Sequence, residues 1–341
     1  MSEKIKINIF FRKPIIGQHY SIENVYNDII TNNYNIFYFQ KKICPFESKG
    51  FFKRFFLIIW AAFNQGDINH VTGDINFINF FFKKRSTILT VPDLYLLSKF
   101  NFIYYFLYKI FWLNLPISKS SVVITVSQKI KSEILKYSNI NKNKIKVINC
   151  PLNKIFKLSR KKFNKKPVIL IIGTAPNKNI ERMISAIKGV NCKLRIIGKI
   201  NYNIKDRLNS FCIEYKELFN LTNEEVFQEY KKCDMLLFVS LYEGFGLPII
   251  EAQAVGRPVI TSNIEPMKSI GSTGALYVNP YKINQINKSI LMIINNSSLR
   301  TKLINNGLKN ASKYKLNKVK KEYLEFYKNF YENTICHNKS I

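Results

Sequence analysis

The feature that most constrains the fold of this chain is a repeated alternation of short apolar runs with helical segments. Residues 5–11 and 122–126 are rich in β-branched and aromatic side chains, Ser127 is suited to cap a helix, and residues 128–137 have helical spacing. Strands that alternate with helices are typical of parallel sheets, because each connection must cross over the sheet. The alternation therefore predicts an α/β fold.

The alternation is interrupted once, which divides the chain of 341 residues into two domains. Residues 156–166 are polar and strongly basic without a regular period, so we expect them to form a linker. We predict an N-terminal domain over 1–155 and a C-terminal domain over 167–316, each doubly wound and Rossmann-like. Residues 317–341 should form a C-terminal helix that returns toward the N-terminal domain.

The composition is strongly basic, with 53 Lys and Arg against 22 Asp and Glu and a net charge of +31. Such an excess predicts attraction to nucleic acid, to membrane headgroups or to phosphorylated substrates. No helix-turn-helix, RNP-like or zinc-finger sequence accompanies the charge, so a nucleic-acid-binding protein is a hypothesis that rests on charge alone. Compositional bias over a solvated surface accounts for most of the excess.

Cysteines and apolar runs bear on location. The six cysteines are scattered, without a C-x-x-C pair or histidines at metal spacing, which argues against structural zinc and favours a reducing compartment. The sequence has no export-signal pattern and no charge-free apolar stretch of the ~18 residues that cross a bilayer. We expect a cytoplasmic protein, with peripheral contact at the inner face of the membrane left open.

The segment richest in chemistry is 240–251, with the sequence SLYEGFGLPIIE. It follows an apolar strand, and open α/β sheets bind ligands at the carboxyl ends of their strands. Gly244 and Gly246 allow the backbone to turn close to a bound group. The amides around Gly246 and Leu247, at the start of a helix, predict a site for a phosphate or diphosphate.

Two glutamates flank this loop. Glu243 precedes the glycines, and Glu251 is expected in the first turn of a helix that begins at Pro248. Carboxylates accept hydrogen bonds from sugar hydroxyls, so Glu251 suits a ribose and Glu243 a second polyol. The preference for Glu in a first helical turn explains Glu251 alone equally well. Together with the anion site, the two carboxylates predict a site for a nucleotide sugar.

The stretch from Glu243 to Glu251, followed by Gly256-Arg-Pro-Val-Ile, resembles the signature of glycosyltransferase family 4. Upstream, Ile172-Gly-Thr-Ala-Pro-Asn-Lys-Asn179 is similar to the first loop of that family's C-terminal domain. The resemblance implies a GT-B fold, in which two Rossmann-like domains face a cleft. It also implies a retaining transfer of a hexose from a nucleotide-diphosphate sugar to a glycan or lipid-linked acceptor, in surface polysaccharide or lipopolysaccharide synthesis.

GDP-mannose is a donor that the resemblance suggests. The chain has no D-x-D motif, so we expect no metal and no cofactor besides the nucleotide-sugar co-substrate. A GT-B relative of different chemistry, an epimerase or a phosphorylase, is an alternative. The oligomeric state is not predicted.

Carried onto this sequence, the resemblance gives Lys178 contact with the donor diphosphate, where a cation would neutralise charge that grows in the transition state. Glu243 would bind the transferred sugar and Glu251 the ribose. Lys178 and Glu243 are therefore catalytic candidates. The other donor-side positions are Gly17, Thr174, Lys199, Gly244, Phe245, Gly246 and Leu247.

In the first domain, His70 and Asp74 resemble cleft residues of the family, and His70 is a third catalytic candidate. An isolated histidine is as well explained by a structural role. Asp93 is assigned to the acceptor side, although relatives commonly read Thr-x-His-Asp where this chain has Thr90-Val-Pro-Asp93. Because Pro92 replaces that histidine, an enzyme with weakened or no activity is an alternative.

Two segments of the first domain, 49–60 and 99–112, combine basic with aromatic residues. Each has the composition of an interfacial helix on an anionic membrane. Each is also compatible with a core helix whose lysines reach the surface along their apolar stems.

Overall fold

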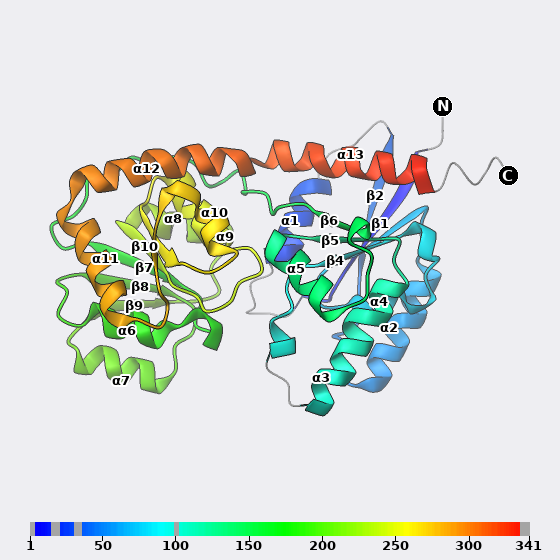
Figure 1. Ribbon diagram of the computed structural model, residues 1–341, viewed down its shortest axis with the longest axis horizontal. Helices are drawn as coiled ribbons and strands as arrows, with labels where there is room; N and C mark the ends of the chain where they lie inside the picture. Colours follow the sequence, from blue (N-terminus) through cyan, green and yellow to red (C-terminus); the bar gives the residue numbers. More distant parts are fainter. Residues whose placement is uncertain (1–3, 15–20, 31–35, 99–101, 335–341) are drawn as a thin grey trace. The chain divides into compact units, whose positions relative to one another are not determined.

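The computed structural model describes residues 4–14, 21–30, 36–98 and 102–334 (Figure 1). The chain divides into two compact units, one formed by Met1–Pro151 with Leu316–Ile341 and the other by Leu152–Lys315. Each unit is built on a parallel sheet with helices on its faces.

In the described part of the first unit, six parallel strands lie in the order β2-β1-β3-β4-β5-β6. The strands are β1 (Ile5–Phe11), β2 (Phe37–Ile43), β3 (Ile68–Val71), β4 (Thr87–Val91), β5 (Val122–Thr125) and β6 (Ile145–Val147). The helices are α1 (Ser21–Ile30), α2 (Phe51–Phe63), α3 (Phe102–Tyr108), α4 (Leu115–Ser118), α5 (Gln128–Tyr137) and α13 (Leu316–Thr334).

In the second unit, six parallel strands lie in the order β12-β11-β10-β7-β8-β9, which differs from the order of the first sheet. The strands are β7 (Val168–Ile172), β8 (Lys193–Ile197), β9 (Glu214–Leu218), β10 (Met235–Phe238), β11 (Val259–Ser262) and β12 (Ala275–Val278). The helices are α6 (Ile180–Ile187), α7 (Tyr202–Ser210), α8 (Asn223–Lys232), α9 (Leu247–Val255), α10 (Met267–Gly271), α11 (Ile283–Asn295) and α12 (Ser297–Ala311). This is the doubly wound order of Rossmann-like folds, as predicted.

Helix starts follow the signals in the sequence. Ser127 caps α5, where its hydroxyl accepts a hydrogen bond from the amide of Ile130 at 3.4 Å. Thr222 and Glu225 form the capping box of α8, with the Glu225 carboxylate 2.7 Å from the Thr222 amide. These caps satisfy amides that have no partner inside a helix, which is why a short pattern fixes the start of each helix.

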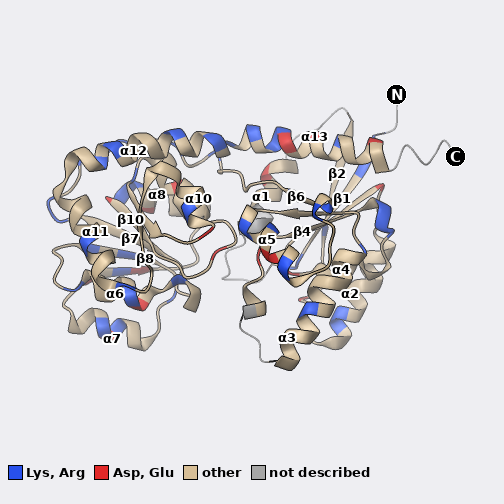
Figure 2. Ribbon diagram, viewed as in Figure 1, with Lys and Arg blue, Asp and Glu red and all other residues tan. Residues whose placement is uncertain are grey.

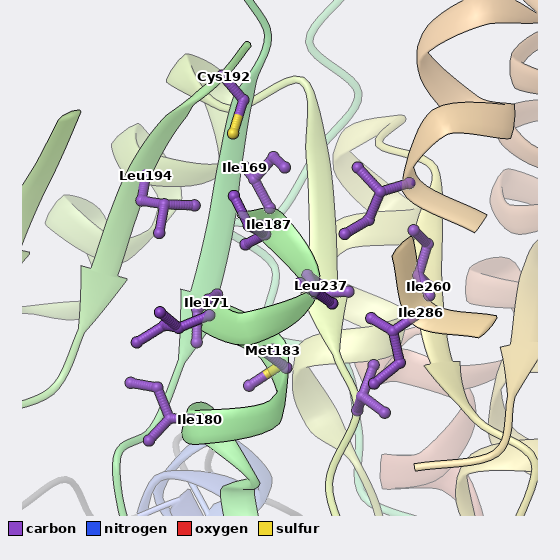
Figure 3. Packing of buried hydrophobic residues seen from close by; sticks show 14 of the residues in the cluster. Ile169, Ile171, Ile180, Met183, Ile187, Cys192, Leu194, Leu237, Ile260 and Ile286 are labelled. Atoms are coloured by element: carbon purple, nitrogen blue, oxygen red, sulfur yellow. The ribbon is translucent and has the colours of Figure 1, made fainter. Parts of the chain in front are cut away.

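The core of the second unit lies between its sheet and the helices on one face (Figure 3). Ile169 and Ile171 of β7 and Leu237 of β10 meet Met183 of α6 and Ile286 of α11 there. All five side chains are almost fully buried. Close packing of this kind resists movement, so it holds the carboxyl ends of β7 and β10 in fixed positions.

The boundary between the units lies earlier than predicted, because the expected linker 156–166 belongs to the second unit. Phe156 is buried against the ring of Tyr230, and the amine of Lys161 contacts Asp234 at 2.8 Å. The prediction of a linker rested on basic composition alone. The buried ring of Phe156 and the contact of Lys161 with the buried Asp234 instead hold this segment against the second unit.

Candidate functional site

The candidate site lies where the strand order of the second sheet reverses. β7 and β10 are neighbours in the sheet, but the chain leaves β7 toward β8 and leaves β10 toward β11 on the opposite side. The loops at their carboxyl ends, 173–178 and 239–246, contact one another. Ligands of open α/β folds bind at such switch points, because the diverging connections leave the strand ends uncovered.

The structure brings Lys178 and Glu243 together at this point. The Lys178 amine donates a hydrogen bond to Glu243 Oε1 at 2.7 Å and lies 5.0 Å from the centre of the Phe238 ring. The side chains are only 21% and 12% exposed, so the pair is shielded from much of the solvent. Lysine has three N–H donors, and this contact uses one.

Gly173 shapes the floor beneath the lysine. It adopts φ +89°, and a Cβ there would lie 2.8 Å from Lys178 Cε. Any larger residue would combine a left-handed backbone with a clash, so Gly173 fixes the path of the lysine side chain.

Two asparagines, to which the sequence motif alone gave no role, hold the two loops in fixed positions. Asn177 donates to the carbonyl of Tyr242 at 3.0 Å, and the buried Asn179 donates to the carbonyls of Val239 at 3.0 Å and Pro280 at 2.8 Å. Asn179 also adopts φ +60°, which asparagine tolerates better than most residues. The tolerance of asparagine for this conformation is a signal in the sequence that could have marked Asn179. The carbonyl groups that its side chain binds, however, are 60 and 101 residues away.

Helix α9 begins at this site. Gly246 precedes it with φ +106°, a left-handed conformation that glycine adopts without strain, and Phe245 is buried against the ring of Tyr314. Helix geometry leaves the first amides of a helix without intrahelical acceptors, and the helix dipole is positive there. In α9, Pro248 has no N–H and the Ile249 amide donates to the Gly246 carbonyl at 3.0 Å, so the candidates for binding an anion are the amides of Gly246 and Leu247. The end of the helix that follows the loop of Glu243 has the features of an anion site, and its binding of a phosphate stays a prediction.

Glu251 lies in the second turn of α9, because the helix begins at Leu247 and not at Pro248. This corrects the expectation of a first-turn position and removes the helix dipole as the reason for an acid there. Glu251 accepts a hydrogen bond from the hydroxyl of Tyr230 at 2.9 Å, and burial raises the pKa of its carboxyl to about 7. Tyr230, fully buried on α8, is a site residue that the sequence did not reveal.

Thr174 and Lys199 follow neighbouring strands at the same edge of the sheet. The Thr174 side chain packs against Gly198, where a Cβ would lie 2.7 Å from its methyl group, and Lys199 is exposed after β8. Gly244 and Leu247 are partly exposed on either side of the buried Phe245. The predicted donor-side residues of the second unit thus follow the adjacent strands β8, β7 and β10 or lie on α9. Lys199 is the most peripheral of them.

In the first unit, two of the candidate residues, Asp74 and Asp93, lie near the hydroxyl of Tyr108, whose pKa is raised by burial and then by their charges. Asp74 is exposed and pairs with Arg12 at 2.7 Å, between the ends of β3 and β1. Asp93 is also exposed and accepts a hydrogen bond from the amide of Tyr95 at 3.0 Å. Gly17 lies outside the described residues.

The structure favours a structural role for His70 over the predicted catalytic one, because the side chain is fully buried with both ring nitrogens hydrogen bonded. Nδ1 lies 2.7 Å from the hydroxyl of Tyr327 on α13, and Nε2 lies 2.7 Å from that of Thr90. Burial lowers the pKa of His70 to about 3. The residue therefore links α13 to the sheet, and its imidazole is uncharged at neutral pH.

Within the described ranges, no group of three or more His, Cys, Asp and Glu side chains is placed to bind a metal ion. Over the same part of the chain, none of the helices has both the length and the hydropathy needed to cross a bilayer.

Comparison with known proteins agrees with this architecture. Residues 154–310 match the family described as glycosyl transferases group 1. The O-antigen chain mannosyltransferase RfbU of Salmonella typhimurium is 33% identical over 178 residues, which are 50% of either chain. An uncharacterized glycosyltransferase of Methanocaldococcus jannaschii is 28% identical over 237 residues, 62% of this chain and 60% of that one.

The chain thus spans between half and about three fifths of the length of these relatives. Among solved structures, HepE of Anabaena in complex with UDP-glucose superposes with a TM-score of 0.79 at 14% identity, covering 95% of this chain and 100% of that one. Such a superposition shows the fold alone. The chain has the two-domain α/β fold known as GT-B.

Proposed function

We propose that this protein is a glycosyltransferase that moves a hexose from a nucleotide-diphosphate sugar to a glycan or lipid-linked acceptor. The single observation that carries the proposal is the partly buried Lys178–Glu243 pair beside the start of α9, at the switch point of the sheet. A cation and helix amides suit a diphosphate, and a carboxylate suits sugar hydroxyls. The similarity to RfbU and to group 1 glycosyl transferases supports the same assignment.

In the proposed reaction the donor diphosphate lies against Lys178 and the amides that begin α9. The bond from the sugar to the diphosphate breaks, and negative charge grows on the leaving phosphate. Lys178 and the amides stabilise that charge as hydrogen-bond donors that the fold holds near one another. Glu243 holds the transferred sugar, and Glu251 accepts hydrogen bonds from the ribose.

We further propose that the transfer is retaining and needs no metal ion, since the lysine and the amides supply the positive charge. GDP-mannose is the first donor to test because RfbU is named a mannosyltransferase, and UDP-glucose is the second because HepE was crystallised with it. The relative's role in an O-antigen chain favours an acceptor in polysaccharide or lipopolysaccharide synthesis, with the protein in the cytoplasm at the inner face of the membrane.

Ligand-dependent thermal stability separates this proposal from its alternatives. A ligand that binds only the folded protein raises the free energy of unfolding, by about 2.7 kcal/mol when free ligand is at a hundredfold excess over Kd. The melting temperature rises as a consequence. We expect GDP or UDP and the matching nucleotide sugar to stabilise the protein, and duplex DNA and RNA to have no effect. Stabilisation by nucleic acid alone would instead support the hypothesis based on charge.

A matched pair of variants locates the binding. Lys178→Ala should remove the stabilisation by nucleoside diphosphate, whereas Lys302→Ala, which changes an exposed lysine on α12, should leave it intact. Unaltered stabilisation of Lys178→Ala would contradict the assigned site. Product analysis with a stabilising nucleotide sugar then distinguishes transfer from epimerisation or phosphorolysis.

A further inference from the structure

Helices α2 and α3 of the first unit expose an unusual set of aromatic side chains. Phe52 on α2 is 75% exposed and Phe102 on α3 is 80% exposed. Only Leu57 and Ala61 of α2 are buried, and α3 has no buried residue. The interpretation of these segments as core helices is therefore wrong for most of their aromatic residues. The part of the second segment that covers 99–101 lies outside the described residues.

The two helices belong to one surface. Figure 1 draws α2 and α3 beside one another, and the Arg54 guanidinium of α2 lies 4.6 Å from the centre of the Trp112 ring, which follows α3. Exposed rings pair along this surface, for example Phe55 with Phe56 and Phe102 with Phe106. We call the exposed residues of 51–63 and 102–112 the aromatic face.

Basic residues predominate along the two segments of the aromatic face, although Glu47 lies near Lys53, and Asp74 and Asp93 lie near Tyr108. No Asp or Glu occurs from residue 48 to 66 or from 94 to 132. Lys53 is exposed between the phenylalanines of α2, and Lys109 follows α3. Basic residues lie on helices throughout both units (Figure 2), and in this region they lie beside the exposed aromatic side chains of α2 and α3.

We propose that the aromatic face binds the surface of an anionic phospholipid bilayer. Rings that leave water enter the boundary between headgroups and acyl chains, while the neighbouring lysines meet anionic headgroups. A second copy of the chain fits less well, because a twofold contact through this face would bring its basic residues against one another. The proposal goes beyond the assigned transfer and does not depend on the donor site.

The test is cosedimentation of the full chain with vesicles of phosphatidylcholine alone or mixed with phosphatidylglycerol. We expect binding to the mixed vesicles that weakens at high salt, because salt screens the lysines. Equal binding to both kinds of vesicle, or none to either, would overturn the proposal. Both tryptophans of the chain, Trp60 and Trp112, lie in these segments, so bound vesicles should also shift tryptophan emission to the blue.

Variants assign the contact to the aromatic face. The triple variant Phe52→Ser, Phe56→Ser, Phe106→Ser should bind mixed vesicles about tenfold more weakly or worse, because it removes three rings from the buried area. The control Phe219→Ser changes a ring that is similarly exposed in the second unit and should bind normally. Equal binding by the triple variant and the control would overturn the proposal.

Two further measurements keep the test independent of folding and of the donor site. Lys53→Gln with Lys109→Gln leaves the apolar area in place and should weaken binding to mixed vesicles several-fold. Stabilisation by nucleotide should persist in all these variants, so its loss would report on the proposed transfer and not on the membrane. If the aromatic face instead mediates a concentration-dependent dimer that ignores vesicles, the proposal is wrong.

Discussion

At the scale of single residues, the second unit holds an ion pair that a donor must rearrange. Lys178 and Glu243 neutralise each other at 2.7 Å over the ring of Phe238, in a partly buried setting where charges interact strongly. An incoming diphosphate offers the lysine a second anionic partner, and a sugar hydroxyl offers the glutamate a donor. A ligand that carries both groups would therefore exchange part of this ion pair for its own contacts.

Glu251 should make stability depend on pH. Its folded-state pKa of about 7 lies above the ordinary value of 4.5, so the native state holds a proton that the unfolded chain has lost. Stability contributed by that proton is present at low pH and disappears as the pH rises toward 7. Between pH 5 and pH 8, Glu251→Gln should gain about 2 kcal/mol relative to the wild type.

Thermal unfolding followed by circular dichroism at the two pH values checks this expectation. A difference between wild type and variant that stays constant with pH would contradict a raised pKa at Glu251. Glu224→Gln, on the exposed side of α8, is the control and should show no such trend.

Tyr230 should act as a positioning residue for Glu251. Its hydroxyl donates to the Glu251 carboxylate at 2.9 Å and favours the ionised form. Tyr230→Phe keeps the ring and removes this bond, so the pKa of Glu251 should rise further and the ribose should lose an oriented acceptor. We expect a rise of about tenfold in KM for the donor, largest below pH 7, with kcat changed less.

Steady-state kinetics of nucleotide release across that pH range test this split. A fall in kcat with KM unchanged would assign Tyr230 to another role. A lower melting temperature of Tyr230→Phe without any kinetic change would give Tyr230 a purely structural role.

At the scale of elements, α13 is joined to the sheet of the first unit by buried polar contacts. His70 connects Thr90 with Tyr327, and Tyr26 lies 3.1 Å from the hydroxyl of Tyr323. Because these groups are buried, each unmade bond would cost about 1 to 3 kcal/mol, so the cluster specifies where α13 docks.

His70 predicts acid sensitivity of the first unit. Its folded-state pKa of about 3 lies below the ordinary 6.5, so its contribution is complete above pH 6.5 and is lost as the pH falls toward 3. His70→Gln should be less stable than the wild type at pH 7.5, and the gap should narrow by about 2 kcal/mol at pH 5. Tryptophan fluorescence during denaturant unfolding reports this unit selectively, because Trp60 and Trp112 both lie in it. A gap independent of pH would contradict the buried neutral histidine.

Local signals allowed most elements to be predicted, because caps and apolar runs act within a few residues. The contacts that complete the site could not be predicted, since Tyr230 and Asn179 meet partners 21 and 60 residues away. His70 shows the same limit, because its partner Tyr327 is 257 residues distant. Glu251 was identified, but a helix that begins one residue early changed the reason for its position.

At the scale of the whole molecule, two doubly wound units with different strand orders carry different features. The second unit holds the candidate anion site at the start of α9, the lysine and both glutamates, whereas the first presents the aromatic face. Two local features, the lysine of the candidate site and the basic residues beside the aromatic face, therefore account for part of the net charge of +31. The rest is a general basic bias of the composition. A chain built in this way suits transfer from a water-soluble donor to an acceptor at a membrane.

The most direct test of the transfer is nucleotide release from a panel of nucleotide sugars by the wild type, Glu243→Gln and the control Glu224→Gln. We predict release from at least one donor, GDP-mannose first, with the control unchanged and Glu243→Gln slower by about a hundredfold while still folded. Release by Glu243→Gln at the wild-type rate would contradict the role of Glu243. If the folded wild type released nucleotide from none of the donors, the central claim itself would be contradicted.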